Sequence, residues 1–452
     1  MSCPVFTRYA TDEMLKIFSE ESKIERWLKV EAALAQAQAE LGIIPKEAAD
    51  EISKKANLEY VKLKRVKEIE EEIDHDLLAV VNALAEVCEH GHGRFVHRGA
   101  TSYDIEDTAW ALAFKEALML LKNSFIDLTR ILLKKAMDYN DLICIGRTHG
   151  QHALPTTYGM KFALWSYDTY RNLKRLDFLF ENDILGKMSG AVGTMAAFGD
   201  KGIELQSKVM EKLGLNNALI TNQVVQRDVF SDMIYFIALS AANLEKIAKE
   251  IRNLQRTEIS EVLEPFSAKQ AGSSTMPHKR NPHRSERICS LARYLRSLVS
   301  VSLENIPLEH ERDLTNSANE RIILSHSFIL LHYMIKEMID IIKNLEINEK
   351  NVKRNLNLLN GIYLAERVML ALVDRGMKRS DAYEIVKNTA IRCYENGLDF
   401  FEELYNNEEV KSRLEKNELK NLLDPTGYIG ESKKIVESVV KEIESYLNIS
   451  KQ

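Results

Sequence analysis

Apolar residues recur at spacings of three and four along most of this chain, over long stretches without proline. In 69–88 this spacing places an apolar stripe on one face of an amphipathic helix. The stripe consists of Ile69, Ile73, Leu77, Val81, Leu84 and Cys88. The same rhythm predicts a helix over 106–139, with Asp104 as its N-cap. Further helices are expected over 156–184, 225–263, 284–304 and 320–344.

No stretch shows a convincing period-two alternation of apolar and polar residues, which would indicate a strand, and no internal repeat is visible. The predicted fold class is therefore all-α, with a core of long antiparallel helices. The apolar rhythm breaks near 345–355, and shorter helices follow to the end. We expect three helical domains, 1–98, 99–348 and 349–452, of which the central one is the long-helix bundle.

The composition supports long helices, because only 19 glycines and 8 prolines occur in 452 residues. Lys and Arg number 61 against 67 Asp and Glu, so attraction to nucleic acid or to an anionic membrane is not expected. The chain has no run of about 18 apolar residues and no basic-then-apolar N-terminal segment, which argues against a membrane span and a signal peptide. Five scattered cysteines indicate reduced thiols in a cytoplasmic protein.

Helix breakers and reactive side chains coincide in three loops. The first, 96–104, offers the hydroxyls of Thr101 and Ser102 just before a helix, where free N–H groups suit a carboxylate. The alternative is that these residues only cap the helix. The second loop, 146–155, holds His149 between small polar residues. This histidine is either a general acid or base, or a hydrogen-bonded structural residue.

The third loop, 272–287, contains two prolines that exclude a regular helix. Gly272 and Ser273 provide flexibility and a hydroxyl at its start. The basic residues that follow are Lys279, Arg280, Arg284 and Arg287. Such a cluster suits an anionic small molecule. A nucleic-acid patch is the alternative, but it needs more basic surface than one loop of an acidic protein provides.

A metal site is a further alternative to consider. Cys88, His90, His92 and His97 lie close together in the sequence. Their spacing matches no common structural zinc site, so no metal is expected here.

The distance between two of these loops bears on assembly. A helix over 106–139 would be about 50 Å long at 1.5 Å per residue. Thr101 and Ser102 precede one end of it, and His149 follows the other. If both loops serve one site, a single chain can hardly bring them together, whereas chains packed antiparallel could. We therefore expect an obligate oligomer with a shared site.

The segment GSSTMPHKRNP at 272–282 closely resembles the signature of the fumarase/aspartase superfamily. GRTHGQHA at 146–153 and the segment 101–104 resemble its other two signature regions, in the same order. Within the superfamily the chain resembles the adenylosuccinate lyase family, which has an Arg-Tyr pair, a His-Asp pair and an Arg-x4-Ser-x3-Arg pattern. The matching residues are Arg8, Tyr9, His75, Asp76, Arg312, Ser317 and Arg321. With DPTGYIG at 424–430, the resemblance covers essentially the whole chain.

This resemblance implies a lyase of purine nucleotide biosynthesis, which eliminates fumarate from adenylosuccinate to give AMP, and from SAICAR to give AICAR. It implies Ser273 as the base, His149 as the general acid, Glu286 as the carboxylate on the other ring nitrogen, and His75 near the reacting nitrogen or the phosphate. The residues implied around the succinyl carboxylates are Thr101, Ser102, Thr148, Gln223, Lys279 and Asn281. Those implied at the phosphate and nucleotide end are Arg8, Tyr9, Arg312, Ser317 and Arg321, and Asp76 and Arg287 complete the substrate-binding set. No metal or organic cofactor is implied, and the implied assembly is a homotetramer.

Two other functions stay open on the sequence. Carboxymuconate cycloisomerases share a similar signature loop, whereas argininosuccinate lyase and fumarase differ around Lys279. The His75-Asp76 pair and the pattern over 312–321 favour a nucleotide substrate. A catalytically silent helical scaffold or nucleotide-binding regulator belongs to a different class. The presence of Ser273 and His149 gives no sign of lost catalysis.

Overall fold

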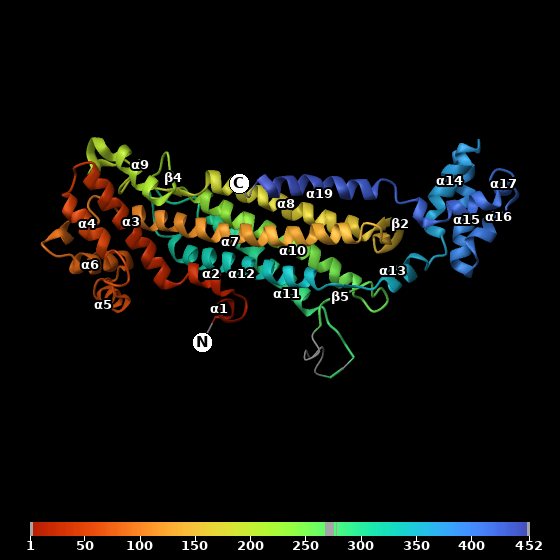
Figure 1. The fold of residues 1–452 in the computed structure, drawn as a ribbon, viewed down its shortest axis with the longest axis horizontal. Helices are drawn as coiled ribbons and strands as arrows, with labels where there is room; N and C mark the ends of the chain where they lie inside the picture. Colours follow the sequence, from red (N-terminus) through yellow and green to blue (C-terminus); the bar gives the residue numbers. More distant parts are fainter. Residues whose placement is uncertain (1–2, 267–274, 277, 450–452) are drawn as a thin grey trace. The chain divides into compact units, whose positions relative to one another are not determined.

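The computed structural model describes residues 3–266, 275, 276 and 278–449. Helices make up most of this part of the chain, which confirms the predicted all-α class (Figure 1). The chain divides into two compact units. Unit 1 comprises Met1–Phe125, Arg171–Glu245 and Arg287–Glu337, and unit 2 comprises Ile126–Tyr170, Lys246–Glu286 and Met338–Gln452. The domain boundaries expected near 98 and 348 remain predictions.

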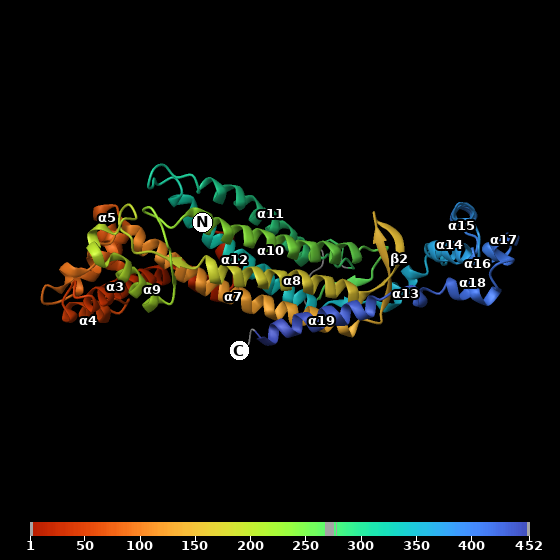
Figure 2. The same cartoon turned by 90° about the horizontal axis from the view of Figure 1, so that it is seen from above.

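Long helices supply most of the structure (Figure 2). They are α3 (Glu20–Glu40), α7 (Ser102–Asp138), α8 (Tyr158–Asn182), α10 (Arg227–Leu254), α11 (His283–Glu304) and α12 (Ser317–Lys343). In the core of unit 1, Phe114 of α7 meets Phe230 of α10 and Phe328 of α12, with ring centroids 5.2 and 5.7 Å apart. These aromatic contacts form because the apolar stripe of each helix faces the others.

The predicted helices agree with the structure except at particular ends. Those over 106–139, 156–184, 284–304 and 320–344 are confirmed to within a few residues. The helix expected over 225–263 is too long, because α10 ends at Leu254. Asp104 is not the N-cap of α7, which begins at Ser102. Instead, its carboxylate accepts a hydrogen bond from the backbone N–H of Thr101 at 2.8 Å, as in a capping box.

The remaining helices of unit 1 are short. They are α1 (Pro4–Arg8), α2 (Asp12–Ile17), α4 (Lys46–Lys55), α5 (Leu63–Ile73), α6 (Asp76–Val87), η1 (His92–Phe95), η2 (Ala196–Lys201) and α9 (Gly202–Leu213). Helices α4, α6 and α9 pack against α3. The prediction of a single helix over 69–88 is wrong, because α5 ends at Asp74, where φ is 53°, and α6 begins after it. The apolar spacing of four continues across this break and hides it.

Helices of 18 residues or fewer build the C-terminal part of unit 2. They are α13 (Glu349–Leu356), η3 (Ile362–Leu364), α14 (Ala365–Asp374), α15 (Arg379–Asn396), α16 (Phe400–Tyr405), α17 (Glu408–Lys411), α18 (Lys416–Leu422), η4 (Pro425–Gly427) and α19 (Ser432–Ile449). Val368 and Leu372 of α14, Val386 of α15 and Phe400 of α16 are buried in one apolar cluster. This cluster gives the segment 365–422 a core of its own.

The structure contains strands where the sequence gave no period-two signal. β1 (Ile143–Thr148) pairs antiparallel with β2 (Gln151–Thr157) in a hairpin of unit 2. Two-residue strands form the pairs β3 (Leu185–Gly186) with β4 (Asn216–Asn217), and β5 (Val262–Leu263) with β6 (Glu346–Ile347). The hairpin register shifts between Ile145 and Arg147, and this irregularity breaks the alternation that would have revealed the strand.

Of the helices in the described residues, α12 alone is long and apolar enough to span a membrane by length and composition. Its best window has a mean hydropathy of 1.3, and 61% of that window is buried within the structure. A core helix of a soluble protein passes the same test, so this helix is weak evidence for a membrane span.

Candidate active site

His75 stands at the break between α5 and α6, which directs its side chain toward the start of α7. Asp74, in the left-handed conformation, ends α5, and His75 caps α6. Nδ1 of His75 accepts a hydrogen bond from the backbone N–H of Leu78 at 3.3 Å. The neutral ring therefore carries its proton on Nε2, which lies 3.5 Å from Oγ of Ser102. The cap thus sets both the orientation and the tautomer of His75.

Asp76 and Arg321 form an ion pair beside His75. Nη1 of Arg321 lies 2.8 Å from Oδ2 of Asp76, and Nη2 lies 3.8 Å from Oε2 of Glu106. Burial raises the pKa of Asp76, but the charges of Arg321 and Lys23 outweigh it, so this pKa is below its ordinary value. Burial, and then the charge of Asp76, raise the pKa of Glu106 to about 7. One guanidinium therefore lies between an ionised carboxylate and a carboxyl group that titrates near neutrality.

These side chains line a cavity of about 340 Å³ in unit 1, called here the arginine cavity. Its walls come from the α5–α6 turn, the start of α7, the loop before α12 and the start of α12. Predicted catalytic or substrate-binding residues that line it are His75, Asp76, Ser102, Arg312, Ser317 and Arg321. The other lining residues are Glu70, Asp74, Tyr103, Glu106 and Leu314. Two guanidinium groups in a cavity of this size suit an anionic small molecule.

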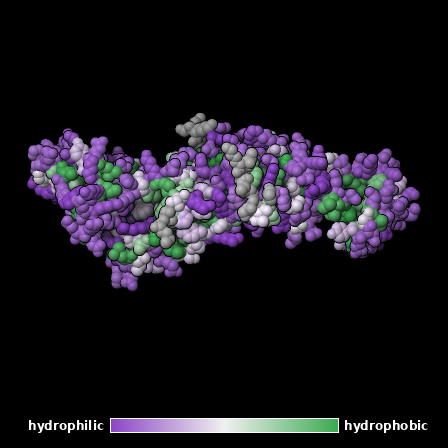
Figure 3. Space-filling model, turned by 90° about the horizontal axis from the view of Figure 1, so that it is seen from below, coloured by the Kyte–Doolittle hydropathy of each residue, from purple (hydrophilic) through white to green (hydrophobic). Residues whose placement is uncertain are grey.

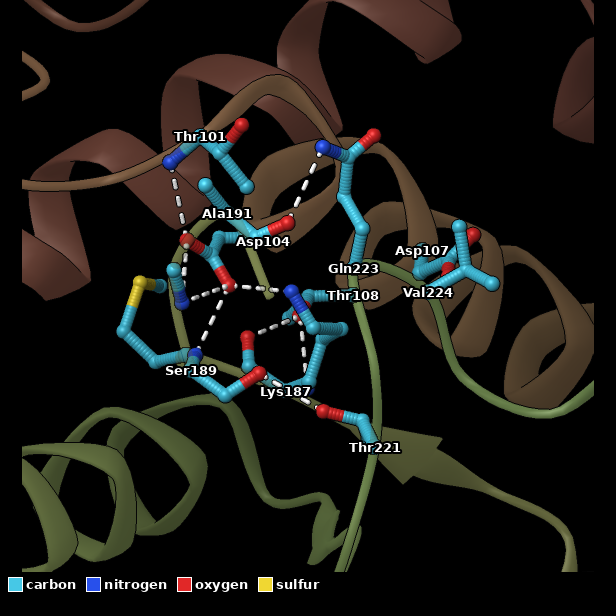
Figure 4. A network of polar contacts seen from close by, with 12 residues as sticks. Thr101, Asp104, Asp107, Thr108, Lys187, Ser189, Ala191, Thr221, Gln223 and Val224 are labelled. Carbon is cyan, nitrogen blue, oxygen red and sulfur yellow. Dashed lines mark hydrogen bonds and ion pairs between the residues drawn. The ribbon is translucent and has the colours of Figure 1, made fainter. Parts of the chain in front are cut away.

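Gln223 joins this group through Arg312. Nη1 of Arg312 donates to Oε1 of Gln223 at 2.9 Å, and the guanidinium lies 3.9 Å from the centre of the Tyr103 ring. Nε2 of Gln223 donates to the carbonyl of Ala191 at 3.1 Å (Figure 4). The backbone N–H of Gln223 donates to the carbonyl of Glu311 at 3.3 Å. Both ends of the Gln223 amide are therefore held in the structure.

Asp104 organises the backbone under the start of α7 (Figure 4). Its Oδ1 lies 2.5 Å from Nζ of Lys187, and neither side chain has exposed surface. The same carboxylate accepts hydrogen bonds from the backbone N–H groups of Thr101 and Ser189, both at 2.8 Å. This network fixes the backbone of Thr101, the residue just before Ser102. The buried carboxylate of Asp104 therefore positions Thr101 and Ser102, the two residues predicted to bind a carboxylate.

A second buried ion pair joins α7 to α10 and α12. Arg227 donates to the two carboxylate oxygens of Asp107 at 3.0 and 2.9 Å, and its Nε lies 3.1 Å from Glu320. The charged residues of unit 1 that sequence reasoning missed are Glu106, Asp107, Lys187, Arg227 and Glu320. The sequence did contain a signal for such buried charges, namely the three acidic residues Asp104, Glu106 and Asp107 in the first turns of an apolar helix. That signal indicates buried partners without identifying them.

The segment that carries Arg8 and Tyr9 is held on α12. Thr11, the N-cap of α2, has its Oγ1 2.6 Å from Nδ1 of His332, whose Nε2 lies 3.0 Å from Oγ of Ser124. Burial lowers the pKa of His332 to about 4, so the ring is neutral near pH 7. Each ring nitrogen therefore has a hydroxyl partner. Arg8 is exposed at the end of α1.

Tyr9 and Arg287 contact the same residue of α12. The rings of Tyr9 and Tyr333 meet edge to face, with centroids 5.8 Å apart. Nη1 of Arg287 donates to the Tyr333 hydroxyl at 2.7 Å and lies 3.4 Å from Glu337. Tyr333 thus connects two predicted binding residues, although neither is among the described residues that line the arginine cavity.

In unit 2, His149 lies at the tip of the β1–β2 hairpin. His149 and Gly150 are the two turn residues, with φ of 54° and 77°. Positive φ at both positions is what a type I′ turn requires. Thr148 pairs with Gln151 across the turn, and both Thr148 and His149 are exposed. The turn geometry, rather than side-chain packing, sets the place of His149.

The base of the hairpin is held by Glu261, which sequence reasoning also missed. Glu261 binds Nη2 of Arg147 at 2.6 Å, the Tyr158 hydroxyl at 2.7 Å and Nδ2 of Asn355 at 2.8 Å. Burial raises the pKa of Glu261, but these hydrogen bonds outweigh it and keep the pKa below its ordinary value. His152, opposite Arg147 in the hairpin, has its pKa lowered by burial and by that charge.

The signature loop is described in this structure at residues 275, 276 and 278–282. Ser273 lies outside the described residues. Lys279 and Asn281 precede α11, and Glu286 is exposed in its first turn. Among the described residues of unit 2, no hydrogen bond joins Glu286 to His149. The expected pairing of these two side chains therefore stays a prediction.

The histidines that suggested zinc have other contacts. His92 pairs with Glu51, and Nδ1 of His97 lies 2.6 Å from Oε1 of Glu31. Burial and the charge of Glu51 raise the pKa of the Cys88 thiol to about 11. In the described part of the chain, no cluster of three His, Cys, Asp or Glu side chains could hold a metal ion.

The comparisons with known proteins match this chain along its length. Residues 7–295 match a family model described as lyase, and residues 361–439 match one described as adenylosuccinate lyase C-terminus. An adenylosuccinate lyase from Pyrococcus abyssi is 53% identical over 441 residues, covering 98% of both chains. An adenylosuccinate lyase from Methanocaldococcus jannaschii is 49% identical, covering 98% of this chain and 96% of the relative.

Solved structures of similar fold include a 3-carboxy-cis,cis-muconate lactonizing enzyme from Pseudomonas putida. Its TM-score is 0.90 at 30% identity, covering 98% of this chain and 100% of the other. A fumarate lyase from Mesorhizobium has a TM-score of 0.88 at 30% identity, covering 96% and 98%. The higher identities over nearly full length separate this chain from those enzymes. This chain belongs to the adenylosuccinate lyase family.

Proposed function

We propose that this chain releases fumarate from adenylosuccinate and leaves AMP. The observation that carries the proposal is the arginine cavity, where Arg312, Ser317 and Arg321 lie with His75 and Asp76. These residues come from segments far apart in the sequence. Relatives named adenylosuccinate lyase match 98% of the chain and support the same substrate.

The arginine cavity suits the nucleotide end of this substrate. A phosphate dianion binds guanidinium groups through charge-assisted hydrogen bonds, and Arg312 and Arg321 supply two such groups. Ser317 adds a hydroxyl donor. Arg8 and Tyr9 complete this end of the proposed site, since their segment is fixed on α12, the helix that also carries Arg321.

The proposed elimination moves one proton off carbon and one onto nitrogen. A base removes the proton next to a succinyl carboxylate, the C–H electrons form the double bond of fumarate, and the C–N bond breaks. The departing nitrogen then takes a proton from an acid. Ser273 is the proposed base and His149 the proposed acid, with Glu286 supporting His149. Thr101, Ser102, Thr148, Gln223, Lys279 and Asn281 are proposed to stabilise the negative carboxylates.

A shared site in a homotetramer is part of the proposal. Helix α7 is unbroken from Ser102, which lines the cavity, to Asp138, a length of about 55 Å at 1.5 Å per residue, and His149 comes after this helix in the sequence. Apolar side chains of four long helices are 48–57% exposed: Met119, Phe178, Tyr235 and Leu303. On the face in Figure 3, apolar areas interrupt a mostly hydrophilic surface. Copies of the chain would cover such side chains.

Three finer statements belong to the same proposal. SAICAR is a second substrate, which releases fumarate to give AICAR. The enzyme acts in the cytoplasm. The elimination uses protein donors alone, without a metal or organic cofactor, because fixed cations and N–H groups can stabilise the charge that develops.

The test is direct. The purified protein is incubated with adenylosuccinate in the presence of a chelator, and AMP and fumarate are measured by mass spectrometry. Equal amounts of both products are expected. Turnover of 3-carboxymuconate but not of adenylosuccinate would overturn the proposal in favour of a cycloisomerase. Tight AMP binding without turnover would instead indicate a silent nucleotide binder.

A further inference from the structure

Glu106 is a buried carboxyl group that no part of the proposed reaction uses. It lies on α7 one turn after Ser102 and is 8% exposed. It lines the arginine cavity and also a second cavity of about 330 Å³, which Phe18, Trp27 and Trp110 help to line. Among the described residues, Glu106 and Arg321 are the two that line both cavities. They therefore form the wall between them.

Glu106 shares Arg321 with Asp76, but unequally. Asp76 holds the Arg321 guanidinium at 2.8 Å, whereas Glu106 lies 3.8 Å from it. At 3.8 Å the Glu106 pair is an ion pair without a hydrogen bond. Its carboxyl group is thus the weaker of the two partners and the one that can change with little loss of structure.

The surroundings of Glu106 disfavour its charge. Burial and the charges of Asp76 and Asp107 raise its pKa to about 7, although Arg321 and Arg312 oppose the shift. The charged and titratable groups around it come from six segments: α5 and its C-cap (Glu70, Asp74), the start of α6 with its N-cap (His75, Asp76), α7 (Tyr103, Asp107), α12 (Arg321), the loop before α12 (Arg312) and α3 (Glu20, Lys23, Arg26). Glu106 therefore exists near pH 7 as a mixture of neutral and ionised forms.

A phosphate dianion on Arg321 would change this balance. It would bring two negative charges close to the Glu106 carboxylate, and like charges favour the neutral acid. One proton then moves from solvent to a carboxylate oxygen of Glu106, and no other bond is made or broken. Neutral Glu106 leaves the guanidinium to the phosphate and to Asp76.

We propose that Glu106 is a positioning residue, which shares Arg321 with Asp76 in the free site and takes up a proton when a phosphoryl group binds to Arg321. This inference rests on the proposed function, since it places the phosphate of the substrate at Arg321. It predicts that phosphate binding weakens above neutral pH, because the ionised carboxylate must first be protonated.

The probe is AMP, titrated calorimetrically into the full-length protein at about pH 7.5 in two buffers of different ionisation heat. AMP is then almost entirely a dianion, so proton uptake reports on the protein. The wild type is expected to take up about half a proton more than Glu106→Gln. From about pH 6.5 to 8.5, the Kd of the wild type is expected to rise about tenfold more than that of Glu106→Gln. His75, which lines the same cavity, is present in both proteins.

Glu320→Gln is the matched control. Glu320 is a buried carboxyl group whose pKa is raised to about 6 by burial, but it contacts Arg227 and lines neither cavity among the described residues. Its variant is expected to match the wild type in proton uptake. The inference would be overturned if all three proteins took up the same number of protons on AMP binding, or if both variants lost proton uptake equally. In either case AMP binding and turnover would still support the proposed function. If Glu106→Gln does not fold, the wild type alone is measured, and absence of proton uptake on AMP binding would overturn the inference. Failure of AMP to bind to any of the proteins would overturn the proposed function as well.

Discussion

Asp76 and Arg321 are 245 positions apart in the sequence, and their side chains form an ion pair with a separation of 2.8 Å. The pair joins the first residue of α6 to the first turns of α12. His75 precedes Asp76, and Ser317 precedes Arg321 by one helical turn. One contact therefore aligns the two segments that contribute most of the arginine cavity.

Replacing Arg321 by alanine is expected to weaken substrate binding more than the chemical step. The phosphate loses a charge-assisted partner, so KM should rise about tenfold to a hundredfold, with a smaller change in kcat. Steady-state kinetics with adenylosuccinate measures both. Arg296→Ala removes a surface arginine paired with Glu245 and serves as the control with normal KM. A lowered kcat at unchanged KM would contradict the phosphate assignment.

His149→Ala and Ser273→Ala are each expected to lower turnover at least a hundredfold, because each removes a proposed proton-transfer group. Circular dichroism and AMP binding should stay close to those of the wild type. His152→Gln, three residues further along the same hairpin, tests whether any histidine change there has this effect, and it should retain most activity. Turnover near the wild-type rate in either alanine variant would remove that residue from its role.

The Asp107–Arg227 pair is expected to matter for stability rather than for binding. Arg227 is almost fully buried, so Asp107→Asn leaves a charge without its main partner and should cost about 3–5 kcal/mol. Thermal unfolding compares it with Lys134→Ala, which removes an exposed ion pair with Asp138 and should cost about 0.5 kcal/mol or less. Similar melting temperatures for both variants would show that the buried pair is replaceable.

Stability is expected to fall between about pH 6.5 and pH 4 because of His332. Its pKa is lowered to about 4 in the folded state, so the unfolded chain binds the proton first as pH falls. Between pH 7 and pH 5 this costs about 2 kcal/mol. His332→Gln keeps a polar partner for Thr11 and should reduce this loss. Parallel stability curves for the two proteins between pH 7 and pH 5 would contradict the assignment.

The long helices were predictable from the sequence because their apolar residues keep one period over many turns. That same regularity concealed the break at Asp74, since Ile73 and Leu77 maintain the spacing on either side of it. The β1–β2 hairpin was missed for the opposite reason. Its register shift at Ile145–Arg147 disturbs the alternation of period two.

The candidate site was predictable only where residues form contiguous motifs. Resemblance identified Arg312, Ser317 and Arg321 together, and the structure places all three in one cavity. Glu106 and Lys187 were missed because the role of a buried charged residue depends on its partner, and here each partner is remote in the sequence. No local pattern identifies Arg321 as the partner of Glu106, so only the folded chain shows the relationship.

The contact between Thr11 and His332 also has a consequence for the order in which the chain is made. These residues lie 321 positions apart, so Thr11 leaves the ribosome long before His332 exists. At about 5–20 residues per second, this delay is roughly 15 s to a minute. During that time the segment with Arg8 and Tyr9 lacks its contacts with His332 and Tyr333 of α12. The nucleotide end of the proposed site therefore cannot form before His332 has been made, although Arg8 and Tyr9 precede it by more than 320 residues.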